Sequence, residues 1–158
     1  RCGKKFILIR DEFKNIQIKM HSNNKKIPII FVCLGASDNQ NIGLSVLEIL
    51  TEVNNMIINF ATTSSNIHIG KLQAFAKKNQ NINIHVDSSI ADLMNNSNLA
   101  IVTPSNTLNE VMFLQLPFIA IKTADNQEIM YQYLCKNNYS AFKKNELSKL
   151  LKEVSKYV

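Results

Sequence analysis

Residues 99–121, LAIVTPSNTLNEVMFLQLPFIAI, decide the fold class of this chain. The apolar run Leu99–Val102 has the length of a buried strand, and the polar turn Thr103–Asn106 follows it. Apolar residues at helical spacing then predict a helix over Thr107–Leu114, before a proline that ends it. The apolar run Phe118–Ile121 completes a strand–helix–strand unit. Such a unit joins two parallel strands of one sheet.

The same alternation of apolar runs and amphipathic stretches continues on both sides of this unit. Strands that are apolar throughout and separated by helices predict a parallel sheet covered on both faces, a Rossmann-like α/β domain. We expect further strands at Ile27–Leu34, Met56–Ala61, Ile82–Val86 and Tyr139–Phe142, and helices at Ile42–Val53, from Ser64 or Ser65 through Ala76, from Ser88 or Ser89 through Met94, from Asp125 or Asn126 through Leu134, and from Asn145 through Val154.

Ligands of open parallel sheets bind beyond the C-terminal ends of the strands. We therefore expect functional residues in the loops after Leu34, Ala61, Val86, Val102 and Ile121. The start of the chain fits this pattern less well. Residues 1–24 are predicted to be the tail of a preceding domain and a linker, and residues 25–158 the Rossmann-like domain. Because the first residue is Arg1 and no apolar leader follows it, we expect a piece of a longer protein.

Composition narrows the classes of partner. The 158 residues carry a formal net charge of +6, contributed almost wholly by lysine, and no apolar run is long enough for a membrane span. Proteins that read DNA bases favour arginine, so we do not expect nucleic acid as a partner. The short apolar runs likewise argue against a membrane partner. An anionic small molecule suits the mildly basic surface. Three widely spaced cysteines argue against a disulfide framework and indicate a reducing cytoplasm.

The turn that opens the helix after Val102 is the strongest candidate site. The amides of Asn106 and Thr107 lie at the predicted helix start, next to Ser105, where the helix dipole favours an anion. Glu110 follows one turn later, and a carboxylate there can accept hydrogen bonds from the vicinal hydroxyls of a ribose. The alternative, to which we give equal weight, is that Glu110 only stabilises the helix by its favourable interaction with the helix dipole.

Two further loops carry candidate residues. Gly35 permits a tight turn or close approach to a ligand, while Ser37, Asp38 and the amides after them could hold phosphate oxygens; an ordinary capped turn is the alternative. Asn126 and Gln127 could contact a sugar or its phosphates, and a plain helix cap is again the alternative.

No residues are spaced as metal ligands, and we expect neither a metal nor a cofactor. The three histidines, His21, His68 and His85, lie far in sequence from any nucleophile, so the catalytic residues stay unassigned.

Together the motifs resemble the C-terminal halves of PseG-type UDP-sugar hydrolases, relatives of MurG-like enzymes with the GT-B architecture. The resemblance rests on Gly35–Asp38, on the tail Asn41–Leu44, on Thr107–Glu110 and on the pair Asn126–Gln127. The stretch Phe6–Phe13 also resembles the Leu-Leu-Arg-x-Glu-Phe sequence that closes the N-terminal half of that family. The chain departs from the family at Asn106 and Gln115, where glycine is usual; asparagine tolerates a left-handed backbone better than other residues.

The resemblance implies a cytoplasmic bacterial enzyme that hydrolyses a UDP-linked diacetamido-trideoxy-altrose on the route to pseudaminic acid, a sugar used in flagellin glycosylation. It implies that Glu110 holds the ribose, that Ser37, Ser105 and Thr107 hold the phosphates, and that the backbone near Val86 holds the uracil. The general base of the family is a histidine of the N-terminal half, which matches none of the histidines here. The chain is thus expected to bind UDP, to pair with its own N-terminal domain, and to be inactive alone.

Two alternatives stay open. A GT-B glycosyltransferase or nucleotide-sugar epimerase would carry the same nucleotide-binding half. A flavodoxin-like or receiver-like module without catalysis is the alternative from another class; Lys122 would suit a receiver, but the paired acids of a receiver are missing.

Overall fold

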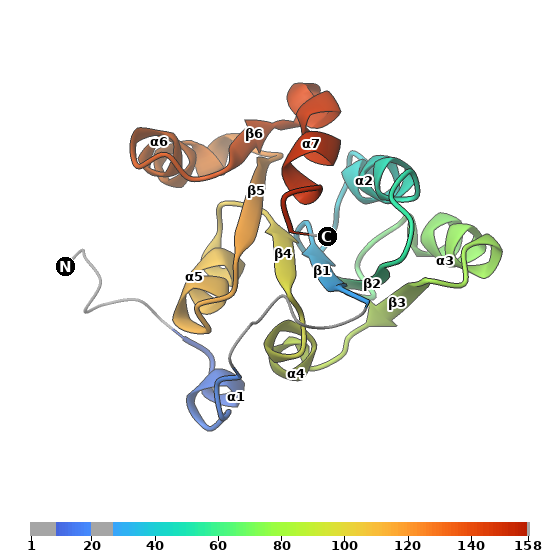
Figure 1. Cartoon of the computed structure of the whole chain (residues 1–158), viewed down its shortest axis with the longest axis horizontal. Helices are drawn as coiled ribbons and strands as arrows, with labels where there is room; N and C mark the ends of the chain where they lie inside the picture. Colours follow the sequence, from blue (N-terminus) through green and yellow to red (C-terminus); the bar gives the residue numbers. More distant parts are fainter. Residues whose placement is uncertain (1–8, 20–26, 158) are drawn as a thin grey trace.

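A parallel sheet of six strands organises the molecule in the computed structural model, which describes residues 9–19 and 27–157. The strand order is β3-β2-β1-β4-β5-β6, and every neighbouring pair is parallel (Figure 1). The strands are β1 (Ile29–Cys33), β2 (Ile57–Thr62), β3 (Ile82–Val86), β4 (Leu99–Val102), β5 (Phe118–Lys122) and β6 (Ala141–Lys143).

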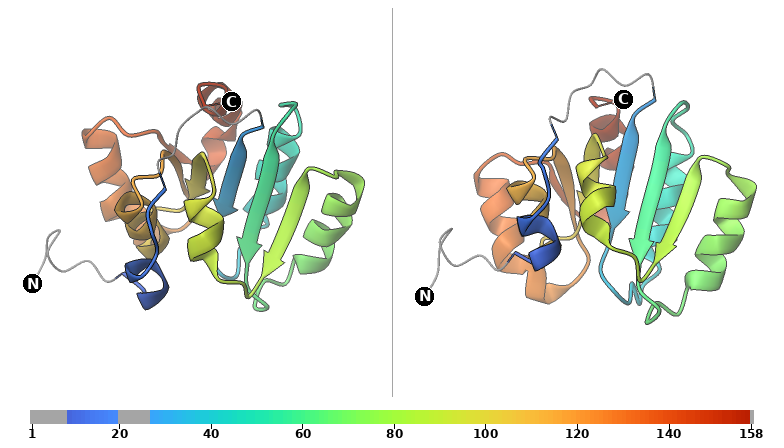
Figure 2. Two further views of the ribbon diagram at one scale, coloured as in Figure 1. Left: turned by 60° about the horizontal axis from the view of Figure 1, so that its bottom comes forward. Right: turned by 90° about the horizontal axis from the view of Figure 1, so that it is seen from below.

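Helices cover both faces of the sheet (Figures 1 and 2). Three of them, α2 (Ile42–Leu50), α3 (Ile69–Lys78) and α7 (Leu150–Val154), pack on one face; α1 (Asp11–Lys14), α4 (Ile90–Asn95), α5 (Asn106–Phe113) and α6 (Glu128–Lys136) pack on the other. Successive residues of β1 alternate between the layers: Ile30 and Val32 join the first core, and Phe31 the second. This arrangement confirms the predicted Rossmann-like fold.

The sheet order reverses at β1 and β4. The chain first builds outward from β1 through β2 to β3, then returns to place β4 on the other side of β1. The carboxyl ends of all the strands meet at one edge of the sheet, at the bottom of both views in Figure 2. A reversal of this kind leaves a crevice at that edge, between the diverging loops, where ligands bind.

The predicted helix starts were wrong at several places. Neither Ser64 nor Ser65 caps α3, which begins at Ile69; the turn before it is closed by Asn66, whose Oδ1 accepts from the His68 amide at 2.8 Å. A short 3-10 turn, Asp125–Gln127, precedes α6, and a longer one, Lys144–Lys149, precedes α7. The polar residues chosen as caps lie inside these tighter turns, because propensity cannot distinguish a 3-10 turn from a first helical turn.

The segment before β1 packs closely on the domain where it is described. Phe13 of α1 is fully buried in the second core. The Asn95 side chain accepts a hydrogen bond from the Lys19 amide at 3.0 Å and donates one to the Gln17 carbonyl at 2.9 Å. Most of residues 1–24, including Cys2 and His21, lies outside the described residues, and the domain boundary stays a prediction. In the described part of the chain no helix has the length and hydropathy that a membrane crossing needs.

Candidate functional site

A cleft of about 490 Å³ opens at the carboxyl edge of the sheet, beside the point where the strand order reverses. Its walls come from the ends of β1 and β2, the loops after β1, β2 and β3, the starts of α4 and α5, and the segment before α1. The lining residues are Ile9, Arg10, Cys33, Gly35, Ala36, Ala61, Thr62, Thr63, Asp87, Ser88, Ile90, Asn106, Thr107 and Glu110.

The start of α5 points an uncapped helix terminus at this cleft. Ser105 is the N-cap residue, yet its side chain makes no capping bond and lies 3.0 Å from the Thr103 hydroxyl instead. Asn106 and Thr107, the first two helical residues, line the cleft. Amides at an uncapped terminus combine hydrogen-bond donors with the positive end of the helix dipole, so the site suits an anion.

Glu110 lies one turn further along α5 and is almost completely buried, with its side chain 3% exposed. Both carboxylate oxygens accept from Arg10: Nε reaches Oε1 at 2.6 Å and Nη2 reaches Oε2 at 2.6 Å. These bonds are the main reason why the pKa of Arg10 is raised. A carboxylate bound by a guanidinium fork keeps further lone pairs, with which it can accept hydrogen bonds from a ligand.

The loop after β1 contributes backbone. Gly35 lines the cleft with φ +97°, a left-handed conformation that disfavours other residues. Cys33 lies at the end of β1, where burial raises the pKa of its thiol and keeps it a poor nucleophile. Thr63 of the next loop donates to the Ala36 carbonyl at 3.0 Å and ties the two loops together.

Asp38 is engaged within its own loop. Its carboxylate accepts from the amides of Ile42 at 2.9 Å and Gly43 at 2.8 Å, so it fills the N-terminus of α2. Burial raises the pKa of Asp38, and these two hydrogen bonds oppose the shift. Because a protein carboxylate already occupies this helix start, the start of α2 is not open to an anion in the cleft.

Gln127 is likewise engaged locally. Its Oε1 accepts from the amides of Thr123 at 2.8 Å and Ala124 at 3.2 Å, which closes the turn before α6. The cleft lining therefore brings together Gly35, Asn106, Thr107 and Glu110 of the predicted residues. It does not include Ser37, Asp38, Val86, Ser105, Asn126 or Gln127.

Sequence reasoning missed several lining residues. Arg10 belongs to the Phe6–Phe13 stretch that resembles the family, but nothing in that stretch marked it as a cleft residue, since its partner lies 100 residues away. Asp87 and Ser88 follow directly after Val86, in a loop that the strand pattern had indicated, but no motif singled them out. Asp87 has φ +49°, and its side chain accepts from the Ser64 amide at 3.0 Å, so it joins the loops after β2 and β3.

The described histidines lie outside the cleft lining. The His85 ring is 3.1 Å from the Asn59 side chain on the neighbouring strand, and burial lowers the pKa of His85. The His68 ring lies 3.3 Å from the Asn39 carbonyl. Among the described residues, no three His, Cys, Asp or Glu side chains are grouped as they would be around a metal ion.

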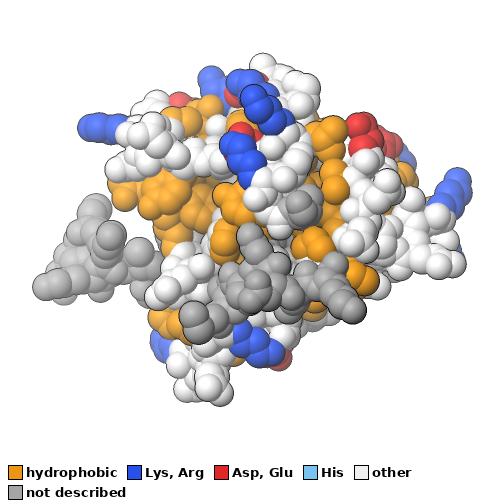
Figure 3. All heavy atoms as spheres, viewed as in Figure 1, with side chains coloured by type: hydrophobic (Ala, Val, Ile, Leu, Met, Phe, Trp, Pro, Cys, Tyr) orange, Lys and Arg blue, Asp and Glu red, His pale blue; other side chains and the backbone are white. Residues whose placement is uncertain are grey.

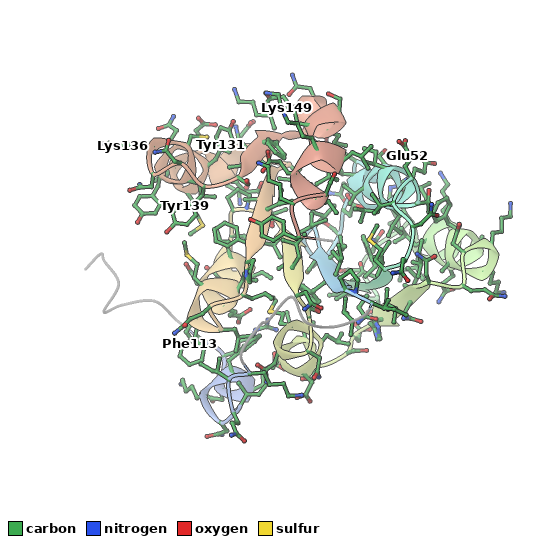
Figure 4. The ribbon with its side chains drawn as sticks, in the orientation of Figure 1. Glu52, Phe113, Tyr131, Lys136, Tyr139 and Lys149 are labelled. Atoms are coloured by element: carbon green, nitrogen blue, oxygen red, sulfur yellow. The ribbon has the colours of Figure 1, made fainter. Side chains whose placement is uncertain are left out.

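A larger apolar groove of about 970 Å³ lies between α5 and α6, where hydrophobic side chains gather on the face shown in Figure 3. Phe113 at the end of α5 and Tyr139 beyond α6 stand on its two sides (Figure 4). Phe118 stacks on Tyr139 with ring centroids 5.3 Å apart. The described residues that line the groove include no charged side chain and no helix start, so the cleft remains the candidate site.

Two known proteins are similar to the chain in sequence. The chain is 39% identical over 140 residues, 88% of its length, to a UDP-2,4-diacetamido-2,4,6-trideoxy-beta-L-altropyranose hydrolase of Campylobacter jejuni. The chain is a relative of this UDP-sugar hydrolase. It spans 49% of the hydrolase, about half of its length. It is also 29% identical over 136 residues to the uncharacterized protein MJ1062 of Methanocaldococcus jannaschii, covering 82% of this chain and 28% of that protein. No family model matches the chain.

Solved structures support the fold of this hydrolase relative. The spinosyn rhamnosyltransferase SpnG complexed with thymidine diphosphate matches 87% of this chain with a TM-score of 0.65, over 38% of its own length. SpnG complexed with spinosyn aglycone matches 84% of the chain, also with a TM-score of 0.65. The sequence identity is 12% in both cases, so the likeness shows a shared GT-B-type fold.

Proposed function

We propose that the chain is the UDP-binding, C-terminal half of a hydrolase that splits UDP-2,4-diacetamido-2,4,6-trideoxy-beta-L-altropyranose into UDP and the sugar. The observation that carries this proposal is the uncapped start of α5 above the buried Glu110, in a chain 39% identical to such a hydrolase. An anion site and a ribose acceptor one helical turn apart would suit the phosphates and the ribose of a nucleoside diphosphate.

The cleft offers a partner for each part of UDP. The diphosphate would accept from the amides of Asn106 and Thr107, and Gly35 would let the backbone approach it. The ribose hydroxyls would donate to Glu110. The uracil would lie at the end of β3, next to Val86 and the lining residues Asp87 and Ser88.

Hydrolysis needs a general base that activates water. Neither His68 nor His85 lines the cleft, and each is engaged with a neighbouring residue. The proposal therefore assigns the base to an N-terminal half that pairs with this chain across the cleft. The chain alone should bind UDP without turning over the UDP-sugar. The product would be used for pseudaminic acid synthesis in the bacterial cytoplasm.

One alternative is transfer of the sugar to an acceptor, as in a GT-B glycosyltransferase. Both reactions use the same nucleotide-binding half, and the other half chooses between water and an acceptor. Assay of the full-length gene product with the UDP-sugar distinguishes them: release of the sugar without added acceptor supports hydrolysis.

Calorimetric titration of the purified chain with UDP tests the binding proposal. We expect saturable binding that weakens by about 1–3 kcal/mol in Glu110→Ala, because the ribose loses hydrogen bonds to a charged acceptor. Glu48→Ala, which removes an exposed carboxylate on α2, is the matched control and should bind like the wild type. The proposal would be refuted if neither the folded chain nor the full-length protein bound UDP in this titration.

A further inference from the structure

Arg10 joins the candidate site to a segment that is remote in sequence. Arg10 lines the cleft, and its guanidinium donates a hydrogen bond of 2.6 Å to each carboxylate oxygen of Glu110. The Arg10 side chain is 52% exposed, whereas that of Glu110 is 3% exposed. The partly exposed arginine therefore lies at the cleft wall and connects the buried carboxylate to the cleft.

Arg10 is itself held from other directions. Its Nη1 lies 3.1 Å from Oε1 of Glu12, and its guanidinium lies 5.3 Å from the ring centroid of the buried Phe13. The other oxygen of Glu12 accepts from the Ser89 hydroxyl at 2.6 Å, at the N-cap of α4. The fork is thus oriented by α1 and α4, independently of Glu110.

We propose that Arg10 is a positioning residue for nucleotide binding, which acts through Glu110. The fork fixes the plane of the carboxylate, so that the remaining lone pairs meet the ribose hydroxyls. It also balances a negative charge that would otherwise lie close to the bound diphosphate. This inference rests on the proposed function, since it assumes that Glu110 binds the ribose.

A lysine at position 10 keeps the charge but loses the fork. Lysine presents a point charge and cannot hold both carboxylate oxygens in one plane. Arg10→Lys should therefore bind UDP with an affinity between those of the wild type and Arg10→Ala. If Arg10 instead kept the ribose away from Glu110, removal of the arginine would strengthen UDP binding.

A double-mutant cycle tests the inference. UDP is titrated into wild type, Arg10→Ala, Glu110→Gln and the double variant, with circular dichroism to confirm that each is folded. We expect Arg10→Ala to weaken binding about 10-fold or more in the wild-type background, the loss typical of a charged hydrogen bond. In the Glu110→Gln background the same change should alter Kd less than about 3-fold, since the group through which Arg10 acts is gone.

Lys14→Ala is the matched control. Lys14 lies on α1, the short helix that follows Arg10, and pairs with the exposed Asp11 at 2.6 Å, away from the cleft lining. Its removal should leave the Kd for UDP unchanged. If the wild type does not bind UDP, the proposed function fails. If the wild type binds but Arg10→Ala binds equally or more tightly, or loses the same factor in both backgrounds, the positioning role is refuted while the proposed function stands.

Discussion

Arg10 and Glu110 lie 100 residues apart in the chain and meet in a two-point ion pair, with Nε–Oε1 and Nη2–Oε2 distances of 2.6 Å. The pair fastens the segment before β1 to the helix that carries the candidate site. Because the carboxylate is buried and the guanidinium half exposed, we expect the pair to affect stability as well as binding.

Removal of the arginine alone should destabilise the fold. Arg10→Ala leaves the buried Glu110 carboxylate without its partner, and we expect a loss of about 1–2 kcal/mol in urea unfolding. This is below the ~3–5 kcal/mol of a fully buried pair, since solvent screens the exposed arginine. The double variant Arg10→Ala/Glu110→Gln should recover part of the loss; a double variant less stable than Arg10→Ala would contradict this account.

Gly43 cannot accept a side chain. A Cβ at this position would lie 2.5 Å from Cζ of Phe60 and 2.8 Å from Oδ2 of Asp38, so Gly43→Ala should force both to move and weaken the cap of α2. We expect a loss of about 1–3 kcal/mol, measured by thermal unfolding. Gly70→Ala in α3 is the control: nothing lies within 4 Å, and it should stabilise by about 0.5–1 kcal/mol. Equal effects at the two sites would show that packing around Gly43 is not decisive.

Gln115 ends α5 in a left-handed conformation, with φ +55°. The Leu116 amide bonds to the Val111 carbonyl and the Gln115 amide to the Met112 carbonyl, both at 3.1 Å, the pattern of a Schellman cap. Left-handed backbone costs a non-glycine residue about 1–2 kcal/mol, offset in part by the greater unfolded-state entropy of glycine. Gln115→Gly should therefore stabilise the chain by about 0.5–1 kcal/mol in chemical unfolding. Asn138→Gly, at the matching cap of α6 with φ +59°, should gain less, and a larger gain there would contradict the reasoning.

Glu153 gives a defined pH dependence. Hydrogen bonds from Lys156 and then Ser140 lower the pKa of Glu153 in the folded chain. Its stabilising contribution is therefore present above the unfolded pKa, about 4.3, and is lost as pH falls through the lower folded value. Thermal unfolding should show the wild type more stable than Glu153→Gln at neutral pH, with the gap closing as pH falls below about 4. A gap that widened with acid would reverse the assigned sign.

The fold could be predicted from local sequence pattern. Runs such as Leu99–Val102, fully buried in the structure, are apolar at every position because both faces of a parallel sheet are covered. That pattern also fixed where strands end, and so it placed Thr107 and Glu110 at the cleft edge. The family has glycine at the positions of Asn106 and Gln115, and the structure treats the two differently. Gln115 adopts the left-handed backbone that glycine favours. Asn106 instead begins α5 and is not among the described residues with positive φ.

Contacts between distant segments were decided only by the tertiary structure. Glu110 could be predicted as a helix carboxylate near a ligand, but not as the partner of Arg10, because no local periodicity relates residues so far apart. Asp38 had the sequence of a phosphate loop, yet its carboxylate turns back onto the amides of α2. Periodicity reports which side of an element is buried, while the partner of each polar group depends on how the chain brings distant elements together.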